Sequence, residues 1–242
     1  LAMAQFNPHV GALGKNVDGM IDAATRAKNQ GADLVVFPEL ALCGYPPEDL
    51  LHKPLFLQKM ASEEQRLLEA LAELNLDAAY GAVRQTEAGL MTAGVLTEKG
   101  QVTGWVGKWQ LPTYGVFDEE RYFIPATETR TLLYRGLQIG LTICEDVWHD
   151  NGPMATQADQ GAQLFLNLNA SPYHIGKGSE REEMVARRVA EHGLPVVYVN
   201  QVGGQDELVF DGGSFVMDHT GTITTRSPFF EAVLSLCTVG VE

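Results

Sequence analysis

Residues 137–148 read LQIGLTICEDVW, a sequence that begins like a buried strand and ends in ionisable groups. The first part is a nearly continuous apolar run with β-branched residues, which is typical of a strand inside a sheet. The run ends in Cys144, Glu145 and Asp146, whose burial would favour the neutral thiol and the neutral carboxyls. A single cysteine is most often a small buried hydrophobic residue. A chemical role for Cys144 therefore requires partners elsewhere in the chain.

Length and composition predict a globular protein that acts on a small polar substrate or a partner protein. The chain has 242 residues, of which 45% are hydrophobic and 20% charged, enough for one large domain or two small ones. The formal net charge of -14 argues against nucleic acid and anionic membranes as partners, because their phosphates would be repelled. No apolar run reaches the length of a membrane span. No signal peptide is visible. The missing initiator Met suggests a piece of a longer chain.

The cysteines predict a reducing compartment, which we take to be the cytoplasm. Cys43, Cys144 and Cys237 are few, odd in number and not spaced like metal ligands. His149, His174 and His192 also lack metal-ligand spacing with acids or thiols, so no metal site is expected.

The order of predicted elements places the chain in the α/β class. Apolar periodicity predicts helices at residues 16–30, 55–74 and 153–160, and a capping box of Ser179 and Glu182 predicts a fourth helix. Buried or half-buried strands are predicted at residues 1–6, 32–37, 78–83, 91–97, 102–106, 131–134, 137–143, 163–168 and 196–200, with short strands joined by turns from residue 208 onward.

An internal echo suggests two related halves, each a sheet with helices on one face. Residues 30–34 read QGADL and residues 160–164 read QGAQL. Both stand where a predicted helix stops and a buried strand starts. Between the halves, residues 107–130 form a long irregular connection, and such connections in compact domains are usually functional.

Polar residues follow three of the predicted strands. Glu39 comes after DLVVF and a proline, Cys144 comes after IGLTI, and Ser171 comes shortly after LFLNL. The carboxyl ends of strands in open α/β sheets are where sites are built, so an acid, a thiol and a hydroxyl at one rim indicate acyl transfer. Lys108, just past a strand, is the candidate cation that steadies an oxyanion and favours the thiolate.

Three motifs now resemble the Glu-Lys-Cys constellation of the nitrilase (carbon–nitrogen hydrolase) superfamily. They are FPEL at 37–40, the stretch 108–123 with LPTYGVFDEERYF, and ICEDVW at 143–148. GYPPEDLL at 44–51 and NASPYHIGK at 169–177 are similar, more narrowly, to the glutaminase domains of glutamine-dependent NAD synthetases. The resemblance covers essentially the whole chain. It implies a four-layer α-β-β-α sandwich and a single hydrolase domain over residues 1–242.

The resemblance also implies catalytic roles. Cys144 is expected to attack the side-chain amide of glutamine and form a γ-glutamyl thioester, with Glu39 as general base. Lys108 is expected to stabilise the oxyanion, together with the backbone N–H of Glu145. Glu119 matches the second glutamate of the family, which orients the lysine and the substrate amide; its neighbour Glu120 is the alternative.

Recognition of free glutamine requires groups for its α-amino and α-carboxylate ends. By the same resemblance, Tyr114 and Glu145 hold the substrate near the amine, with Ser171 nearby. The carboxylate requires a cation, and Lys177 or Arg181 is the candidate. Trp148 and Tyr173 are expected as pocket walls, and Asp146 as a helix cap.

The chain lacks the phosphate loop that an ATP-using synthetase domain requires. Its glycine pairs at 203–204 and 212–213 do not open a helix after a strand, so both are interpreted as turns. The synthetase domain, with its ATP, Mg and deamido-NAD, is therefore expected outside this chain, and no cofactor is expected within it. The family resemblance also implies a homo-oligomer.

Two other functions are alternatives for this sequence. One is a free-standing amidase or nitrilase acting on another small amide. The other is a catalytically silent module, which the presence of Glu39, Lys108 and Cys144 argues against.

Overall fold

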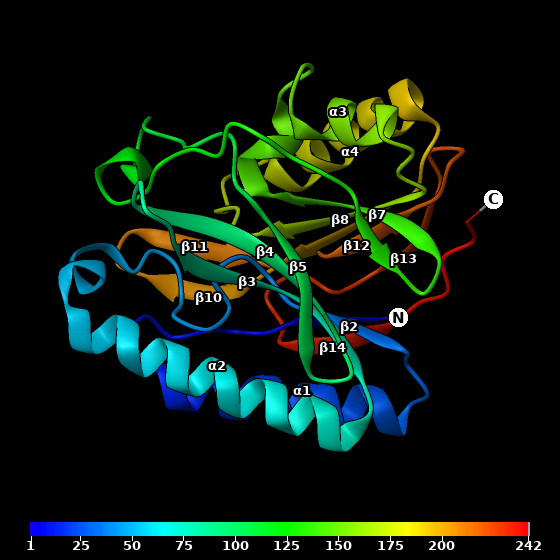
Figure 1. Cartoon of the computed structure of the whole chain (residues 1–242). Coiled ribbons are helices and arrows are strands. Elements are labelled where there is room, and N and C mark those ends of the chain that lie inside the picture. The colour runs from blue at the N-terminus through cyan, green and yellow to red at the C-terminus, as the bar shows by residue number, and fades with distance from the viewer. Residues whose placement is uncertain (242) are drawn as a thin grey trace.

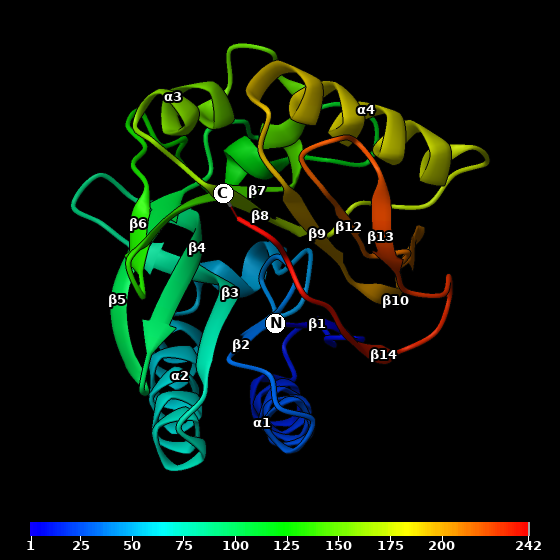
Figure 2. The same cartoon turned by 90° about the vertical axis from the view of Figure 1, so that its right-hand side faces the viewer.

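The computed structural model describes residues 1–241 and confirms the four-layer α-β-β-α sandwich. Helices α1 (Leu13–Asn29) and α2 (Pro54–Leu74) cover the outer face of one sheet. Helices α3 (Pro153–Asp159) and α4 (Lys177–His192) cover the outer face of the other. The two sheets face each other in the middle, as the view in Figure 1 and the perpendicular view in Figure 2 show.

Within residues 1–241 each sheet has six strands. In spatial order the first contains β14 (Val233–Leu236), β1 (Ala2–Gln5), β2 (Leu34–Val36), β3 (Asp77–Gln85), β4 (Leu90–Glu98) and β5 (Gln101–Gly107). The second contains β6 (Leu132–Tyr134), β7 (Leu137–Ile143), β8 (Leu164–Asn169), β9 (Val196–Asn200), β12 (Phe215–Met217) and β13 (Ile223–Arg226). A separate hairpin consists of β10 (Val202–Gln205) and β11 (Leu208–Asp211).

The two sheets repeat one topology. Across the first, the pairings run antiparallel, parallel, parallel, antiparallel, antiparallel. Across the second, from β6 to β13, they run in the same order. The echo QGADL leads α1 into β2, and QGAQL leads α3 into β8, which are matching places in the two halves. Gly31 and Gly161 end these helices at positive φ, 83° and 86°, a conformation that glycine adopts readily.

The packing explains why these segments fold as they do. The buried positions of α1 recur every three or four residues and include Val17, Met20, Ala24 and Ala27, which is the period of one helix face. Between the sheets lies a second apolar layer that includes Val36, Leu96, Leu141, Leu166 and Val199. The close approach of the sheets requires Gly94, because a Cβ there would lie 2.9 Å from the side chain of Leu141.

Two local predictions were wrong. Helix α4 begins at Lys177 with Gly176 as its N-cap, and Ser179 does not cap it. Glu182 instead accepts hydrogen bonds from Arg226 on β13, so tertiary contacts replace the predicted capping box. The glycine pair at 203–204 lies inside strand β10 rather than in a turn.

Smaller differences concern helix ends and the loop after Glu39. Helix α1 begins at Leu13, three residues before the predicted start. The predicted loop at residues 43–54 contains a 3₁₀ helix at Glu48–His52. Among residues 1–241, no helix is both long enough and apolar enough to cross a membrane.

Candidate active site

Glu39 is placed by the exit of strand β2 against strand β3. The Phe37 N–H donates to the Ala79 carbonyl at 2.8 Å, and the Gly81 N–H donates to the Pro38 carbonyl at 3.0 Å. Gly81 is required here because a Cβ at that position would lie 2.6 Å from Glu39 Cα. These contacts hold the Glu39 side chain fully buried, at 0% exposure.

Lys108 follows strand β5 and lies between two buried carboxylates. Its Nζ donates to Glu39 Oε1 at 2.7 Å and to Glu119 Oε1 and Oε2 at 2.8 and 2.9 Å. Tyr45 donates its hydroxyl to Glu119 Oε1 at 2.8 Å. Glu120 is exposed, so the structure brings Glu119 to the lysine and not its neighbour.

Cys144 stands at a sharp turn where strand β7 ends. Its φ is 43°, a conformation that residues other than glycine rarely adopt and that marks local strain. Asp146 supports this turn: its Oδ2 accepts the N–H of Ile143 at 3.0 Å. Its Oδ1 accepts the N–H groups of Trp109 and Gln110, both at 3.0 Å. One buried carboxylate therefore joins the cysteine turn to the segment after Lys108.

This contribution of Asp146 goes beyond the cap predicted for it. The capping geometry is present, since the Asp146 side chain accepts the N–H of Ile143 at the start of the 3₁₀ helix Cys144–Trp148. The link to residues 109 and 110 joins parts of the chain 36 and 37 positions apart. Short-range sequence patterns carry no information about such a link.

The electrostatics favour a neutral thiol beside a carboxylate that can take its proton. Burial raises the pKa of Glu39 to about 7, although the charge of Lys108 acts to lower it. Burial, and then the charge of Glu39, raise the pKa of Cys144 well above its ordinary value, and Lys108 offsets this only in part. Burial would lower the pKa of Lys108, but Glu119 and Glu39 outweigh it and the pKa is raised. Lys108 thus acts in the expected direction, towards the thiolate, but burial and the charge of Glu39 outweigh its effect on the pKa of Cys144.

Cys144 opens onto a cavity of about 330 Å³. Tyr114, Glu145, Ser171 and Lys177 line this cavity, so the structure brings together the residues predicted to bind substrate. Tyr114 donates its hydroxyl to Glu145 Oε2 at 3.0 Å. Trp148 and Tyr173 also line the cavity, as predicted for wall residues. Lys177 Nζ lies 3.9 Å from the centre of the Trp148 ring, a cation–π contact that holds the ammonium group at the wall.

Comparison with known proteins decides the family. The family description "Carbon-nitrogen hydrolase" matches residues 1–240. This chain belongs to the carbon-nitrogen hydrolase family. The resemblance of the motifs around Glu39, Lys108 and Cys144 to those of this family predicted the membership.

Among curated relatives, this hydrolase is 42% identical to the glutamine-dependent NAD(+) synthetase of Synechocystis sp., over 98% of this chain and 45% of the relative. It is 38% identical to the glutamine-dependent NAD(+) synthetase of Acinetobacter baylyi, over 100% of this chain and 44% of the relative. The chain thus spans less than half the length of these two relatives.

Two solved structures resemble the hydrolase over nearly its whole length. The glutamine-dependent NAD+ synthetase from Acinetobacter baumannii superposes with a TM-score of 0.89 at 40% identity, over 97% of this chain and 44% of that chain. An amidase from Nesterenkonia sp. superposes with a TM-score of 0.86 at 27% identity, over 96% of this chain and 87% of that chain.

Arg181 does not face the cavity of this hydrolase. It is 1% exposed, and its Nη1 lies 2.7 Å from Asp211 Oδ1. The guanidinium is therefore not free to bind a substrate carboxylate, and of the two predicted cations only Lys177 lines the cavity.

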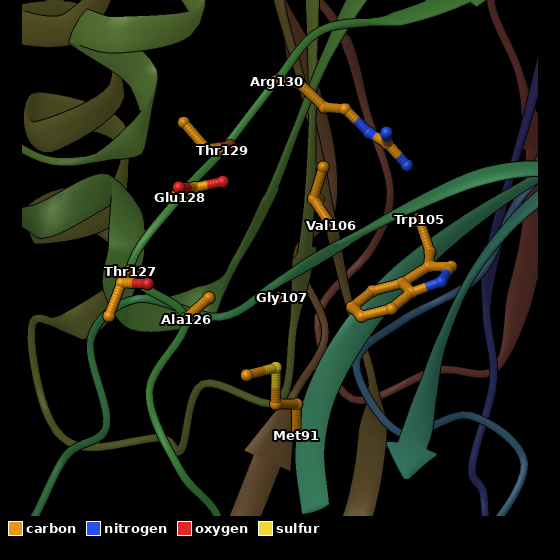
Figure 3. Close-up of a pocket in the computed structure, with 9 residues that line it drawn as sticks. All are labelled: Met91, Trp105, Val106, Gly107, Ala126, Thr127, Glu128, Thr129 and Arg130. Carbon is orange, nitrogen blue, oxygen red and sulfur yellow. The ribbon is translucent and has the colours of Figure 1, made fainter. Parts of the chain in front are cut away.

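A second cavity, of about 360 Å³, lies between strand β5 and the segment 126–130 (Figure 3). Its lining includes Trp105, Glu128 and Arg130 but none of the predicted site residues. In the described part of the chain, no three His, Cys, Asp or Glu side chains form a group that could hold a metal ion.

Proposed function

We propose that this chain is the glutaminase domain of a glutamine-dependent NAD(+) synthetase, with the synthetase domain outside these 242 residues. The supporting observation is the identity of 42% to such a synthetase over 98% of the chain. The buried arrangement of Glu39, Lys108 and Cys144 supports the same function by its chemistry. In this proposal the domain hydrolyses glutamine and supplies ammonia that amidates deamido-NAD.

In the first half of the reaction, the Cys144 sulfur attacks the carbonyl carbon of the glutamine side-chain amide. Glu39 takes the thiol proton, which its pKa of about 7 allows near neutral pH. A protonated Glu39 competes less for Lys108, so the ammonium group and the Glu145 N–H can stabilise the oxyanion. The C–N bond then breaks, Glu39 returns the proton to the leaving nitrogen, and ammonia departs from a γ-glutamyl thioester.

In the second half, water attacks the thioester carbon. Glu39 takes a proton from the water, the C–S bond breaks, and that proton returns to the sulfur of Cys144. Glutamate leaves and the enzyme is restored. Glu119 holds Lys108 in place throughout, because it contacts Nζ with both of its oxygens.

The cavity supports a substrate that carries both charges. Glu145 and Tyr114 are assigned to the α-ammonium group, Lys177 to the α-carboxylate, and Ser171 to the wall beside the amide. No metal or cofactor is required in this mechanism; ATP and Mg are assigned to the synthetase domain. We further propose a homo-oligomeric, cytoplasmic enzyme.

A free-standing amidase is the second candidate. The Nesterenkonia amidase is covered over 87% of its chain, so a protein of about this size can be a whole enzyme of that kind. A mutant of that amidase shows covalent addition of the acetamide moiety of fluoroacetamide at its active-site cysteine. Small neutral amides of this kind have no charged ends for Glu145 and Lys177 to bind.

The test measures glutamate and ammonia release from L-glutamine, asparagine and short aliphatic amides. Wild type and Cys144→Ala are compared, each with and without a synthetase domain from a close relative. The proposal expects the wild type to hydrolyse glutamine and Cys144→Ala not to hydrolyse it. Turnover of aliphatic amides without glutamine turnover would favour the amidase, and no turnover of any amide with the partner present would contradict both.

A further inference from the structure

A buried ion pair lies outside the catalytic group, between helix α4 and hairpin strand β11. Arg181 and Asp211 are each 1% exposed. Arg181 Nη1 donates to Asp211 Oδ1 at 2.7 Å and to Oδ2 at 2.9 Å. Burying two charges is costly, and a hydrophobic pair of similar volume often serves stability as well. Stability alone therefore gives a weak reason for this pair.

The remaining donors of Arg181 are directed at one turn. Its Nε donates to Ser171 Oγ at 3.0 Å, and its Nη2 donates to the carbonyls of Ser171 and Pro172 at 2.9 and 3.0 Å. With the two contacts to Asp211, every N–H of the guanidinium has an acceptor. Asp211 therefore orients the Arg181 guanidinium, and the guanidinium holds the turn at Ser171 and Pro172 in place.

The same turn provides a hydrogen bond to the proposed general base. The Ala170 N–H donates to Glu39 Oε2 at 3.1 Å, while Lys108 occupies Oε1. Asn200 holds the other side of the turn, since its Oδ1 accepts the Ser171 N–H at 2.9 Å. Ala170 thus lies between Glu39, the proposed general base, and Ser171, which both Arg181 and Asn200 hold in place.

We infer that Arg181, oriented by Asp211, is a positioning residue: it fixes the turn 170–172 so that the Ala170 N–H stays directed at the Glu39 carboxylate. Arg181 acts through the backbone of this turn, and it contacts neither the thiol nor the cavity. The inference deepens the proposed function, because it concerns the base of the same site.

A conservative change should loosen the turn without removing the charge. In Arg181→Lys, a single ammonium group replaces the planar fork and cannot satisfy Asp211, Ser171 and Pro172 together. The Ala170 N–H favours the ionised form of Glu39, and its loss favours the protonated form. The protonation of Glu39 should then persist to higher pH.

Other ionisable groups also face Glu39, and the substitution at Arg181 must leave them unchanged. Those whose charges interact with Glu39 are Lys108, Glu119, Cys144, Cys43 and Tyr45. Arg181→Lys alters none of them, so a shifted pH profile reports on the turn.

Helix α4 offers a matched control in Arg188. It is also 1% exposed, and it pairs with Asp150 and Glu191 rather than with the turn. Both Arg188→Lys and Arg181→Lys should lower the melting temperature, but Arg188→Lys should leave the pH profile unchanged. This separates a loss of fold stability from a loss of positioning.

The experiment records two pH profiles for each variant. One is kcat/KM for glutamine. The other is the rate at which iodoacetamide alkylates Cys144, followed by mass spectrometry of the Cys144 peptide so that Cys43 and Cys237 do not contribute. The second profile needs no glutamine turnover, because Glu39 takes the thiol proton in either reaction.

The expected result is an acid limb shifted upward by roughly 0.5 to 1 pH unit in both profiles of Arg181→Lys. Asp211→Asn, measured in parallel, should shift the same limb in the same direction. A folded variant that melts at a lower temperature but keeps the wild-type acid limb would overturn the inference. If the alkylation profile shifts although wild type does not hydrolyse glutamine, the proposed function fails and the positioning role stands.

Discussion

Lys108 Nζ lies 2.7 Å from Glu39 Oε1, although 69 positions separate the two residues in the chain. The same ammonium group contacts both oxygens of Glu119. One buried cation therefore contacts two buried carboxylates, so Lys108, Glu39 and Glu119 carry a net negative charge when all three are ionised. Burial raises the pKa of Glu39 to about 7, because Glu119 offsets part of the lowering that Lys108 causes, and such a pKa suits a general base at physiological pH.

The titration of Glu39 makes a prediction about stability. Its pKa rises from 4.5 to about 7 in the folded protein. As the pH rises, Glu39 therefore loses its proton at a lower pH in the unfolded chain than in the folded protein. The folded state loses stability as the pH rises from 4.5 through 7. Glutamine does not titrate, so the melting temperature of Glu39→Gln relative to wild type should increase between about pH 5 and about pH 8. A difference that stays constant between these pH values would show that Glu39 is already ionised at the lower one.

A second prediction concerns the second carboxylate. Glu119→Gln removes a charged partner of Lys108 and should lower kcat for glutamine by about 10²- to 10³-fold. Tyr45→Phe removes one hydrogen bond to Glu119, worth about 1 kcal/mol, and should lower kcat by roughly fivefold to tenfold. The control is Tyr122→Phe, which loses only an exposed hydrogen bond to Asp49. Equal kcat values for Tyr45→Phe and wild type would remove Tyr45 from this network.

A third prediction tests the link between the cysteine turn and the lysine segment. In Asp146→Asn, the single amide oxygen cannot accept the N–H groups of Ile143, Trp109 and Gln110 together. We expect kcat to fall about 10- to 100-fold while KM for glutamine stays within about threefold, because the substrate contacts are not altered. The exposed neighbour Asp150 provides the control Asp150→Asn. A change in KM alone would mean that Asp146 shapes the cavity instead.

A fourth prediction concerns the substrate carboxylate. Lys177→Met keeps an apolar stem against Trp148 but removes the charge, so KM for glutamine should rise at least about tenfold with little change in kcat. Hydrolysis of propionamide, if it is detectable, should be unaffected because that amide has no carboxylate. The exposed Lys15 on α1 gives the control variant Lys15→Met. Equal losses for both amides would place Lys177 in the chemistry rather than in recognition.

Much of the fold follows from local patterns. Strand β7 at Leu137–Ile143 coincides with its prediction, because an apolar β-branched run bounded by Arg135-Gly136 and Cys144 leaves few alternatives. The echo between residues 30–34 and 160–164 correctly indicated two related halves. The resemblance of the motifs around Glu39, Lys108 and Cys144 to a known family correctly indicated the family.

Contacts between distant parts of the chain could not be predicted in this way. In the sequence, Arg181 and Lys177 are equal candidates for binding the substrate carboxylate. In the fold, Arg181 is buried in an ion pair with Asp211, which lies 30 positions later in the chain. The ionisation of Cys144 depends on where two carboxylates meet Lys108, which only the fold determines. The predicted capping box does not form because helix α4 already begins at Lys177, and Glu182 instead binds Arg226 on strand β13.

The most direct test of the central claim is to look for the acyl-enzyme itself. The hydrolase is mixed with L-glutamine, quenched in acid within the first turnovers, and digested for mass spectrometry of the peptide that contains Cys144. The account predicts a γ-glutamyl group on Cys144 in wild type, and none in Cys144→Ala. Release of glutamate by wild type without any adduct on Cys144, or unchanged release by Cys144→Ala, would contradict it.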